Sequence, residues 1–373
     1  MIPQTDPKAA YLAQKAEIDA ALARALMSGW YILGEEVKGF EREFAAFAGA
    51  PRAIGVANGT DALAIGLRAL GVRPGDRVIT VSHTAVATVA AIEMIGAVPL
   101  LVDIEEGGYG MDPEALEAAL SLPGAPVRAI VPVHLYGHPA AMDRIMPIAT
   151  RAGVAVLEDC SQAHGARLLG QGVGSFGQAA AYSLYPTKNL GALGDGGVLT
   201  ANEATLADHM VALREYGWRE RYVSDIAGQN SRLDELQAAI LRVKLRALDA
   251  DNERRRQIAA LYRAALDGLA FGLPVERRDA RHVYHQFVIR CRRRDQVREF
   301  LRGAGVASNV HYPLPVHLQP AYRGRIALAP SGLARTEEAA RTVLSLPMFP
   351  QLPESDVQRV AAALAGAATS GLD

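Results

Sequence analysis

The chain has 373 residues, half of them hydrophobic and 21% charged, which excludes an intrinsically disordered protein and allows a sizeable core. Its formal net charge is −1, so the composition gives no electrostatic reason to bind nucleic acid or an anionic membrane. The length suits two domains, or one large domain with a smaller one.

The sequence carries no feature of a secreted or membrane protein. Two cysteines are too few for a disulfide framework and are compatible with a reducing cytosol. Residues 1–17 lack the basic start and apolar run of a secretory signal. The most apolar stretch, residues 84–104, is interrupted by Glu93 and Pro99 and is a poor membrane span. We therefore expect a cytoplasmic protein.

Short apolar runs alternate with helical patterns between residues 53 and 202. The expected strands cover residues 53–57, 77–82, 98–104, 128–135, 154–159, 179–185 and 196–202. Their apolar runs are continuous rather than alternating, as in strands that are covered on both faces. Strands and helices in this order predict an α/β domain with a mostly parallel central sheet.

The pattern changes after residue 232, where a long charged helix is followed by a mixture of elements. The expected elements there are helix 233–269, strand 282–291 and helices 294–305 and 354–368. A first helix over residues 6–29 can pack on either half. We predict a large domain of residues 1–245 and a smaller C-terminal α+β domain of residues 246–373.

The turn Asn58-Gly59-Thr60 lies between an expected strand and an expected helix. With Thr60 or Asp61 as the N-cap, the free amides and the helix dipole would make a phosphate site. Gly59 would let the backbone approach the ligand closely. The alternative is an ordinary capped turn.

Asp159 and Lys188 each follow an apolar strand, at the end where open α/β sheets place ligand-binding groups. A carboxylate there can keep a ring nitrogen protonated, although Asp159 alone can equally be a capping residue. A partly desolvated lysine can form a Schiff base, although Lys188 alone can equally be a surface lysine. Together with the phosphate turn they provide the three attachment points of pyridoxal 5'-phosphate (PLP).

Five motifs in order carry a resemblance to a known family. They are "NGTDAL", "EDCSQAHGA", "SLYPTKNLGALGDGGVLT", "NSRLDELQAAIL" and "HYPLPVHLQPAY". In this text the chain strongly resembles the DegT/DnrJ/EryC1/StrS sugar aminotransferases, from about Ile2 to Pro350. That family consists of PLP enzymes with the aspartate-aminotransferase fold, fold type I. The resemblance therefore implies a large domain with a mostly parallel sheet and a smaller α+β domain.

The resemblance also assigns roles to residues of the cofactor site. It implies that Lys188 forms the Schiff base with the cofactor, that Asp159 pairs with the pyridine nitrogen and that Gln162 lies beside the ring hydroxyl. Phosphate ligands would be Gly59, Thr60 and Ser183 of one chain and Asn230 of the neighbouring subunit, so the family site needs a homodimer.

One position departs from the family pattern. Many relatives have an aromatic residue that stacks on the cofactor ring, where this chain has Ala85 in "SHTAVAT". The stacking partner is then expected to be another residue, for which His83 is a candidate.

The expected reaction is transfer of an amino group from L-glutamate to a nucleotide-linked keto-sugar, with pyridoxamine phosphate as the intermediate cofactor form. The text "QAHGA" after the aspartate favours a dTDP-linked 3-keto-6-deoxyhexose over 4-keto sugars or inososes. Tyr185, His311 and His317 are candidate substrate residues, although either histidine can also be structural. His285 is interpreted as a buried structural histidine.

Three other activities fit the sequence less well. Sugar dehydratases of the family lack the lysine, whereas Lys188 is present. A non-catalytic regulatory homologue remains an alternative because of Ala85. A nicotinamide-dependent oxidoreductase is disfavoured because no G-x-G-x-x-G follows the first strand. No metal is expected, because the histidines lack ligand spacing.

Overall fold

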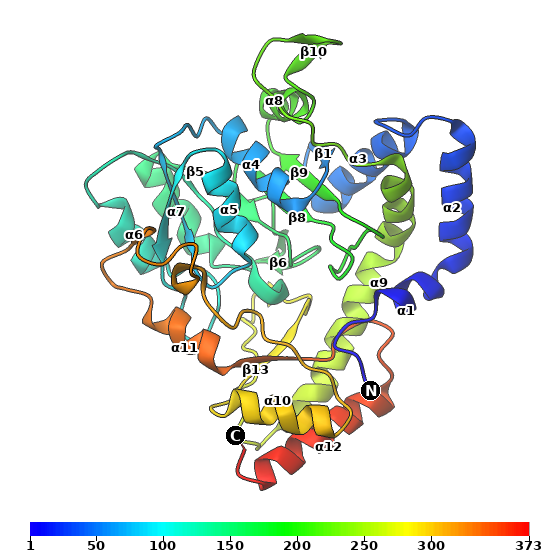
Figure 1. Ribbon diagram of the computed structural model, residues 1–373, viewed down its shortest axis with the longest axis vertical. Coiled ribbons are helices and arrows are strands. Elements are labelled where there is room, and N and C mark those ends of the chain that lie inside the picture. Colours follow the sequence, from blue (N-terminus) through cyan, green and yellow to red (C-terminus); the bar gives the residue numbers. More distant parts are fainter. Residues whose placement is uncertain (373) are drawn as a thin grey trace.

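A central eight-stranded sheet organises the larger part of the molecule. The computed structural model describes residues 1–372 (Figure 1). The strands of this sheet are β1 (Arg52–Val56), β2 (Arg77–Val81), β3 (Val98–Val102), β4 (Val127–Ile130), β5 (Ala155–Asp159), β8 (Ala179–Ser183), β9 (Gly197–Ala201) and β14 (Ala327–Leu328). Their order is β1-β9-β8-β5-β4-β2-β3-β14. Within this sheet β9 is antiparallel to both neighbours and the other pairs are parallel, which confirms the mostly parallel sheet.

Helices cover both faces of the sheet. They are α4 (Gly59–Ala69), α5 (Val86–Met94) and α8 (Ala204–Arg214) on one face, and α3 (Glu35–Ala48), α6 (Pro113–Leu120) and α7 (Met142–Ala152) on the other. Successive residues of β5, Val156 and Leu157, accordingly enter hydrophobic cores on opposite faces. This two-sided burial explains why the strands read as continuous apolar runs.

The long helix α9 (Glu235–Leu266) extends from the sheet region into the smaller part of the molecule (Figure 1). Its first half packs against α2 (Lys15–Ser28) and α3, and its second half against α12 (Glu354–Thr369). The expected first helix is interrupted at Gln14, which separates α1 (Pro7–Ala13) from α2. Through Ile18, Ala21 and Ala25 it is α2 that packs on α9.

The smaller part is an α+β unit around an antiparallel strand pair, as expected. Its elements are β13 (Phe287–Arg290), β15 (Val343–Leu346), α10 (Arg294–Gly303), α11 (Ala334–Thr342) and α12. The chain between α10 and α11 returns to the large sheet, where β14 adds to the edge beside β3. The short helix η2 (Val316–Leu318) lies on this excursion, while η1 (Leu135–Gly137) follows β4.

Short strands outside these two units form two small sheets. They are β6 (Arg167–Leu168), β7 (Gln171–Gly172) and β12 (Ala280–Arg281) in one small sheet, and β10 (Trp218–Glu220) with β11 (Val223–Ser224) in another. The β10–β11 hairpin projects from the body at the top of Figure 1.

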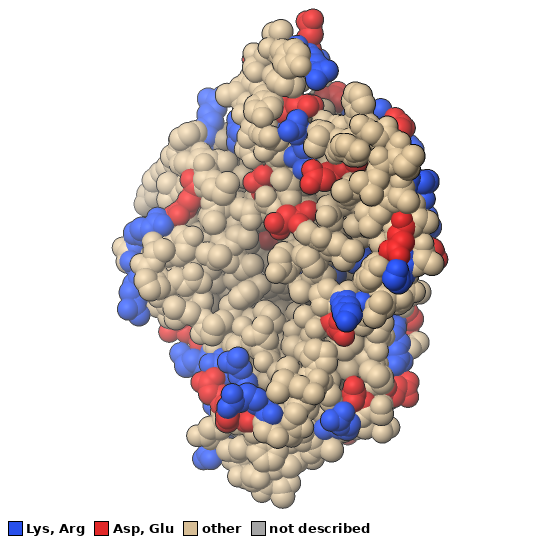
Figure 2. Space-filling model, turned by 45° about the vertical axis from the view of Figure 1, so that its right-hand side comes forward, with Lys and Arg blue, Asp and Glu red and all other residues tan. Residues whose placement is uncertain are grey.

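On the face in Figure 2, basic and acidic side chains are interspersed, in keeping with the net charge of −1. Among residues 1–372, no helix combines the length and the apolar character that a membrane crossing needs.

Candidate active site

A cavity of about 220 Å³ lies where β5 and β8 end and α4 begins. Neighbouring parallel strands deliver their carboxyl ends to the same edge of the sheet, and Asp159 of β5 is paired in register with Ala181 of β8. The cavity brings together eight residues that the sequence singled out: Gly59, Thr60, Ala85, Asp159, Gln162, Ser183, Tyr185 and Lys188.

The start of α4 forms the anion-binding wall of this cavity. Asn58 is the N-cap, because its side chain accepts the amide of Asp61 at 2.8 Å, so the prediction of Thr60 or Asp61 as the cap was wrong. Gly59 and Thr60 are the first helical residues, whose amides have no partner inside the helix. A Cβ on Gly59 would lie 2.7 Å from Cβ of Ser183, so only glycine permits this approach. Free amides beside a serine hydroxyl fit a phosphate group.

Asp159 offers a buried carboxylate to the cavity. Its side chain is 4% exposed, and its two oxygens accept the Thr88 hydroxyl at 2.9 Å and the Ser161 amide at 3.1 Å. A carboxylate has about four acceptor positions, so this one retains capacity for a further donor such as a protonated ring nitrogen.

Lys188 is the basic group of the cavity. Among the described residues its Nζ has no hydrogen-bond or ion-pair partner. Burial lowers the pKa of Lys188 to about 8, and the charge of Asp159 offsets part of that effect. An amine that is unpaired and partly neutral near pH 8 is suited to react with an aldehyde or to carry a proton.

The turn after Lys188 is fixed from behind. The Asn189 amide donates to Asn252 at 2.8 Å and to the carbonyl of Val283 at 3.1 Å, and Lys244 donates to the carbonyl of Gly191 at 2.6 Å. A Cβ on Gly191 would lie 2.5 Å from the carbonyl oxygen of Pro186. The glycine therefore permits the tight turn that presents the lysine.

Gln162 connects the cavity to a residue that the sequence did not single out, Tyr312. The Gln162 side chain accepts the amide of Tyr136 at 2.8 Å and donates to the Tyr312 hydroxyl at 3.1 Å. Burial raises the pKa of Tyr312 to about 12, so its phenol stays neutral. The motif "HYPLPV" contains this tyrosine directly after His311, so the same motif could have indicated it.

The two candidate substrate histidines do not line this cavity. His317 is buried and hydrogen-bonded to Ser82 at 2.7 Å and Glu337 at 3.4 Å. His311 bonds Ser345 at 2.8 Å. Burial lowers the pKa of His311 to about 4, with a further contribution from Lys188, so this imidazole is neutral and within electrostatic reach of the lysine.

His83 does not supply the stacking surface that Ala85 lacks. Its ring is buried, stacks on Tyr109 with centroids 5.6 Å apart and bonds the Tyr136 hydroxyl at 2.8 Å. It is not among the residues that line the cavity. His285 is also buried and bonds Asn189 at 3.2 Å, behind the lysine turn.

Asn230 lies outside the cavity of its own chain. It is exposed, pairs with Glu215 in an isolated antiparallel bridge and follows the β10–β11 hairpin.

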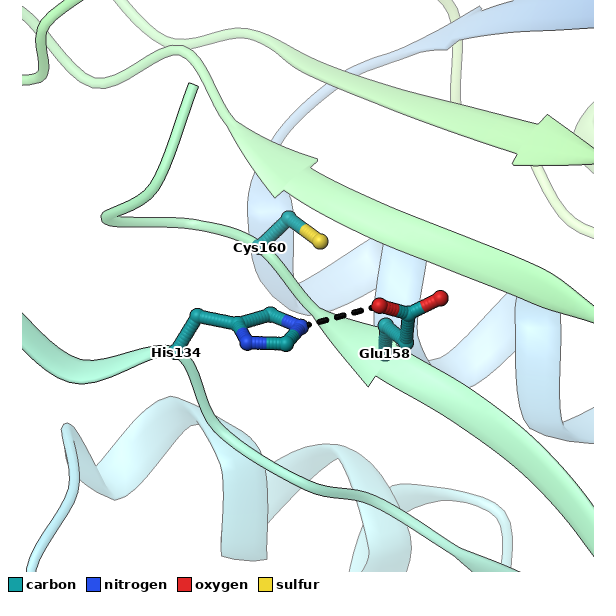
Figure 3. A group of neighbouring side chains, drawn as sticks. All are labelled: His134, Glu158 and Cys160. Atoms are coloured by element: carbon teal, nitrogen blue, oxygen red, sulfur yellow. Dashed lines mark hydrogen bonds and ion pairs between the residues drawn. The ribbon is translucent and has the colours of Figure 1, made fainter. Parts of the chain in front are cut away.

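The side chains of His134, Glu158 and Cys160 form a second group of potential ligands (Figure 3), and two of these residues flank Asp159 in the sequence. Glu158 accepts the His134 ring at 3.0 Å and the amides of Gly174, Phe176 and Gly177, each at 2.8 Å. The other ring nitrogen of His134 accepts the amide of Ala140 at 2.9 Å, so Nε2 carries the proton. Because these lone pairs are occupied, the group is suited to a structural role rather than to metal binding.

The open site therefore combines free helix amides beside a serine, a carboxylate with spare acceptor capacity and an unpaired lysine. These groups fit the phosphate, the ring nitrogen and the aldehyde of PLP. The fold and the site define a PLP enzyme of the aminotransferase type.

The sequence model of the DegT/DnrJ/EryC1/StrS aminotransferase family matches residues 13–365, and the chain belongs to this family. It is 47% identical to the dTDP-3-amino-3,4,6-trideoxy-alpha-D-glucose transaminase of Streptomyces venezuelae, over 96% of this chain and 94% of the relative. It is 46% identical to the erythromycin biosynthesis sensory transduction protein EryC1 of Saccharopolyspora erythraea, over 97% of this chain and 98% of that one.

Solved structures agree with the fold. The crystal structure of S. venezuelae DesV in complex with a ketimine intermediate has a TM-score of 0.95 and 47% identity, covering 98% of both chains. The structure of NtdA from Bacillus subtilis with bound cofactor PMP has a TM-score of 0.87 and 31% identity, covering 96% of this chain and 82% of that one. The expected family, fold type and PLP-dependent aminotransferase class are confirmed.

Proposed function

We propose that this enzyme transfers an amino group from L-glutamate to a nucleotide-linked keto-sugar, and that the sugar is a dTDP-linked 3-keto-6-deoxyhexose. The observation that carries the reaction class is the unpaired Lys188, with its lowered pKa, facing the same cavity as Asp159. The similarity to a dTDP-3-amino-sugar transaminase supports the substrate class.

Residues on three sides of the cavity would hold the cofactor. Gly59, Thr60 and Ser183 would bind the phosphate, Asp159 the ring nitrogen and Gln162 the ring hydroxyl. When bound, PLP supplies a reactive aldehyde and an electron sink for the bond that breaks at the substrate carbon.

Lys188 would carry the proton in both half-reactions. Its amine is largely neutral above pH 8 and makes no hydrogen bond to another described residue that would have to break first. The tight turn behind it holds the backbone in place, so only the side chain needs to move. Asp159, oriented by its two donors, would pair with the ring nitrogen and keep it protonated throughout.

The sugar would enter over Tyr185, whose side chain is 53% exposed at the cavity mouth. Behind the cavity lining, the neutral Tyr312 phenol accepts a hydrogen bond from Gln162, and the neutral His311 precedes it in the chain. Both are uncharged hydrogen-bonding groups. Such groups suit the hydroxyls of a sugar.

A homodimer with shared sites would complete the phosphate site. Asn230 is exposed and lies away from its own cavity, as a residue that serves a partner would. Large apolar side chains are also exposed in the loop between α2 and α3, where the exposed fraction is 62% for Trp30 and 51% for Tyr31. Mixing inactive Asn230→Ala and Lys188→Ala subunits tests this arrangement: partial recovery of turnover supports it, and strict absence of recovery contradicts it.

Two alternatives differ in what they predict. A 4-keto sugar or inosose aminotransferase would complete the glutamate half-reaction but would turn over a different acceptor. A non-catalytic regulatory homologue, suggested by Ala85 and by the similarity to a protein named for sensory transduction, would bind PLP without transferring an amine.

The absorbance of the purified protein with PLP, before and after L-glutamate, separates these functions. Conversion of the absorbance to that of pyridoxamine phosphate supports an aminotransferase with glutamate as donor. A panel of nucleotide keto-sugars then identifies the acceptor. Bound PLP that does not respond to amino donors favours the regulatory homologue, and failure to bind PLP contradicts the proposal.

A further inference from the structure

We propose that Thr88 is a positioning residue that, assisted by Thr84, holds the Asp159 carboxylate oriented toward the cofactor ring nitrogen. This inference rests on the proposed placement of the cofactor beside Asp159. It concerns the two threonines of the stretch "SHTAVAT", to which the cofactor contacts named above assign no role.

The three side chains form a continuous hydrogen-bonded chain. The Thr88 hydroxyl lies 2.9 Å from Oδ2 of Asp159, and the Thr84 hydroxyl lies 3.0 Å from that of Thr88. Thr84 is 2% exposed and Thr88 is 1% exposed, and both line the same cavity as Asp159. Asp159 lies 71 residues after Thr88 in the sequence, so the hydrogen-bonded series exists only because the fold brings these side chains together.

The direction of each hydrogen bond follows from the donors available. An ionised carboxylate can only accept, so Thr88 must donate its single proton to Asp159. Thr88 then has no proton left for Thr84, so Thr84 must donate to Thr88. The two hydroxyls are therefore polarised in the same sense, with their protons toward the carboxylate.

The backbone of this segment leaves the hydroxyls free for that task. Ala85 is the N-cap of α5 and has no side-chain capping atom, and the Thr88 amide bonds the carbonyl of Ala85 at 3.2 Å. A threonine in a first helical turn commonly bonds its own backbone, whereas the Thr88 hydroxyl bonds Thr84 and Asp159. The α5 amino end, with its positive dipole, adds to the stabilisation of the carboxylate.

The test compares threonine variants that remove or retain one hydroxyl. Thr88→Val keeps the shape and removes the donor, and Thr88→Ser keeps the donor. Thr80→Val is the matched control, because Thr80 is equally buried and donates its hydroxyl to the Val131 carbonyl at 2.9 Å, on β2 and outside the cavity lining.

Equilibrium dialysis of the cofactor-free proteins against PLP measures the effect without turnover. Hydrogen bonds to charged groups contribute more than neutral ones, so we expect Thr88→Val to weaken PLP binding by at least about tenfold. Thr88→Ser and Thr80→Val should stay within about threefold of the original protein, and Thr84→Val, one bond further away, should lose about threefold.

Two outcomes overturn the inference: equal affinities in Thr88→Val and Thr80→Val, or a Thr88→Ser protein that binds as weakly as Thr88→Val. Asp159→Asn separates this failure from failure of the cofactor placement. If Asp159→Asn loses affinity and turnover while Thr88→Val retains both, only the role of Thr88 is wrong. If Asp159→Asn retains both, the cofactor does not use Asp159 and the placement itself is wrong.

Discussion

Glu158 and Asp159 are consecutive carboxylates on β5, yet their surroundings are opposite. Glu158 is fully buried and accepts four hydrogen bonds, three from backbone amides of residues 174–177 and one from His134. Asp159 accepts two, and its remaining acceptor capacity faces a cavity that also holds Lys188. A strand points successive side chains to opposite faces, so one position can be structural while the next is functional.

The comparison teaches that burial alone does not distinguish a catalytic carboxylate from a structural one. What differs is whether the acceptor positions are already filled by the protein. A filled carboxylate fixes the loop that donates to it, and a partly filled one is available to a ligand. Variants of the two residues should therefore separate loss of chemistry from loss of stability.

The largest expected effect is a loss of turnover when Asp159, the carboxylate that faces the cavity, or Lys188 is replaced. Lys188→Ala and Asp159→Asn should each lower kcat by about a thousandfold or more, because each removes a group that acts on the reacting centre. Thermal unfolding should show no large loss of melting temperature, since neither side chain supports the core. Steady-state kinetics with glutamate and a keto-sugar provides the measurement, and unchanged turnover would contradict the site assignment.

The second effect is a loss of stability when Glu158, the carboxylate whose acceptor positions are filled, is replaced. Glu158→Gln places an amide group among four donors, so we expect the free energy of unfolding to fall by about 3 kcal/mol. Urea unfolding measures this, with Glu338→Gln at an exposed position of α11 as the control. The activity of the folded fraction should stay within about threefold. Loss of activity without loss of stability would break the distinction between the two carboxylates.

The third effect concerns the pH at which Lys188 becomes reactive. With its pKa lowered to about 8, the cofactor-free protein should be modified at Lys188 with a half-maximal rate near that pH. At pH 8 we expect modification tens of times faster than at the exposed Lys8, scored by peptide mass spectrometry, because about half of the Lys188 amine is neutral. Equal rates at both lysines would contradict the lowered pKa.

The same lowered pKa has a consequence for stability, with a defined sign. Between about pH 8 and 10.5 the unfolded chain still holds the proton that folded Lys188 has released. Because the unfolded chain binds more protons here, Lys188 should make the free energy of unfolding increase as the pH rises through this window. Lys188→Met should remove that contribution.

The smallest effect is at the cavity wall. Ala85→Phe adds the aromatic face that the family pattern has at this position, and stacking contributes about 1 kcal/mol, so PLP binding should tighten by about fivefold. Equilibrium dialysis measures the change, with Ala85→Leu as the control for added apolar bulk. Equal gains from Phe and Leu would mean that packing, rather than stacking, is responsible.

Much of the fold followed from local sequence patterns. The continuous apolar runs gave the buried strands, because a strand covered on both faces needs no polar residue along it. Asp159 ends such a strand and Lys188 lies a few residues after another, so the strand pattern pointed to both. The family motifs then supplied Gly59, Thr60, Gln162 and Ser183, all of which line the cavity.

The rest depended on contacts between distant residues. Two hydrogen bonds of the site join residues that are far apart in the sequence: Gln162 and Tyr312 are separated by 150 residues, and Thr88 and Asp159 by 71. No sequence spacing predicts either bond. The suggestion that His83 replaces the missing aromatic is not supported, because its ring packs against Tyr109. The helix cap is Asn58 rather than the expected Thr60, because the Asn58 side chain accepts the amide of Asp61 and so sets where the helix begins.

Helix α9 has a consequence for how the sequence can change during evolution. Its Lys244 bonds Gly191 in the lysine turn, Asn252 bonds the carbonyl of His164, and Arg255 bonds the carbonyls of Tyr284 and Met348. Inserting or deleting one residue between them would rotate the remainder of the helix by about 100° and break this alignment. We therefore expect no insertions or deletions within residues 244–255. They should be tolerated at surface turns such as residues 105–110, where no helix has to keep its side chains in a fixed rotation.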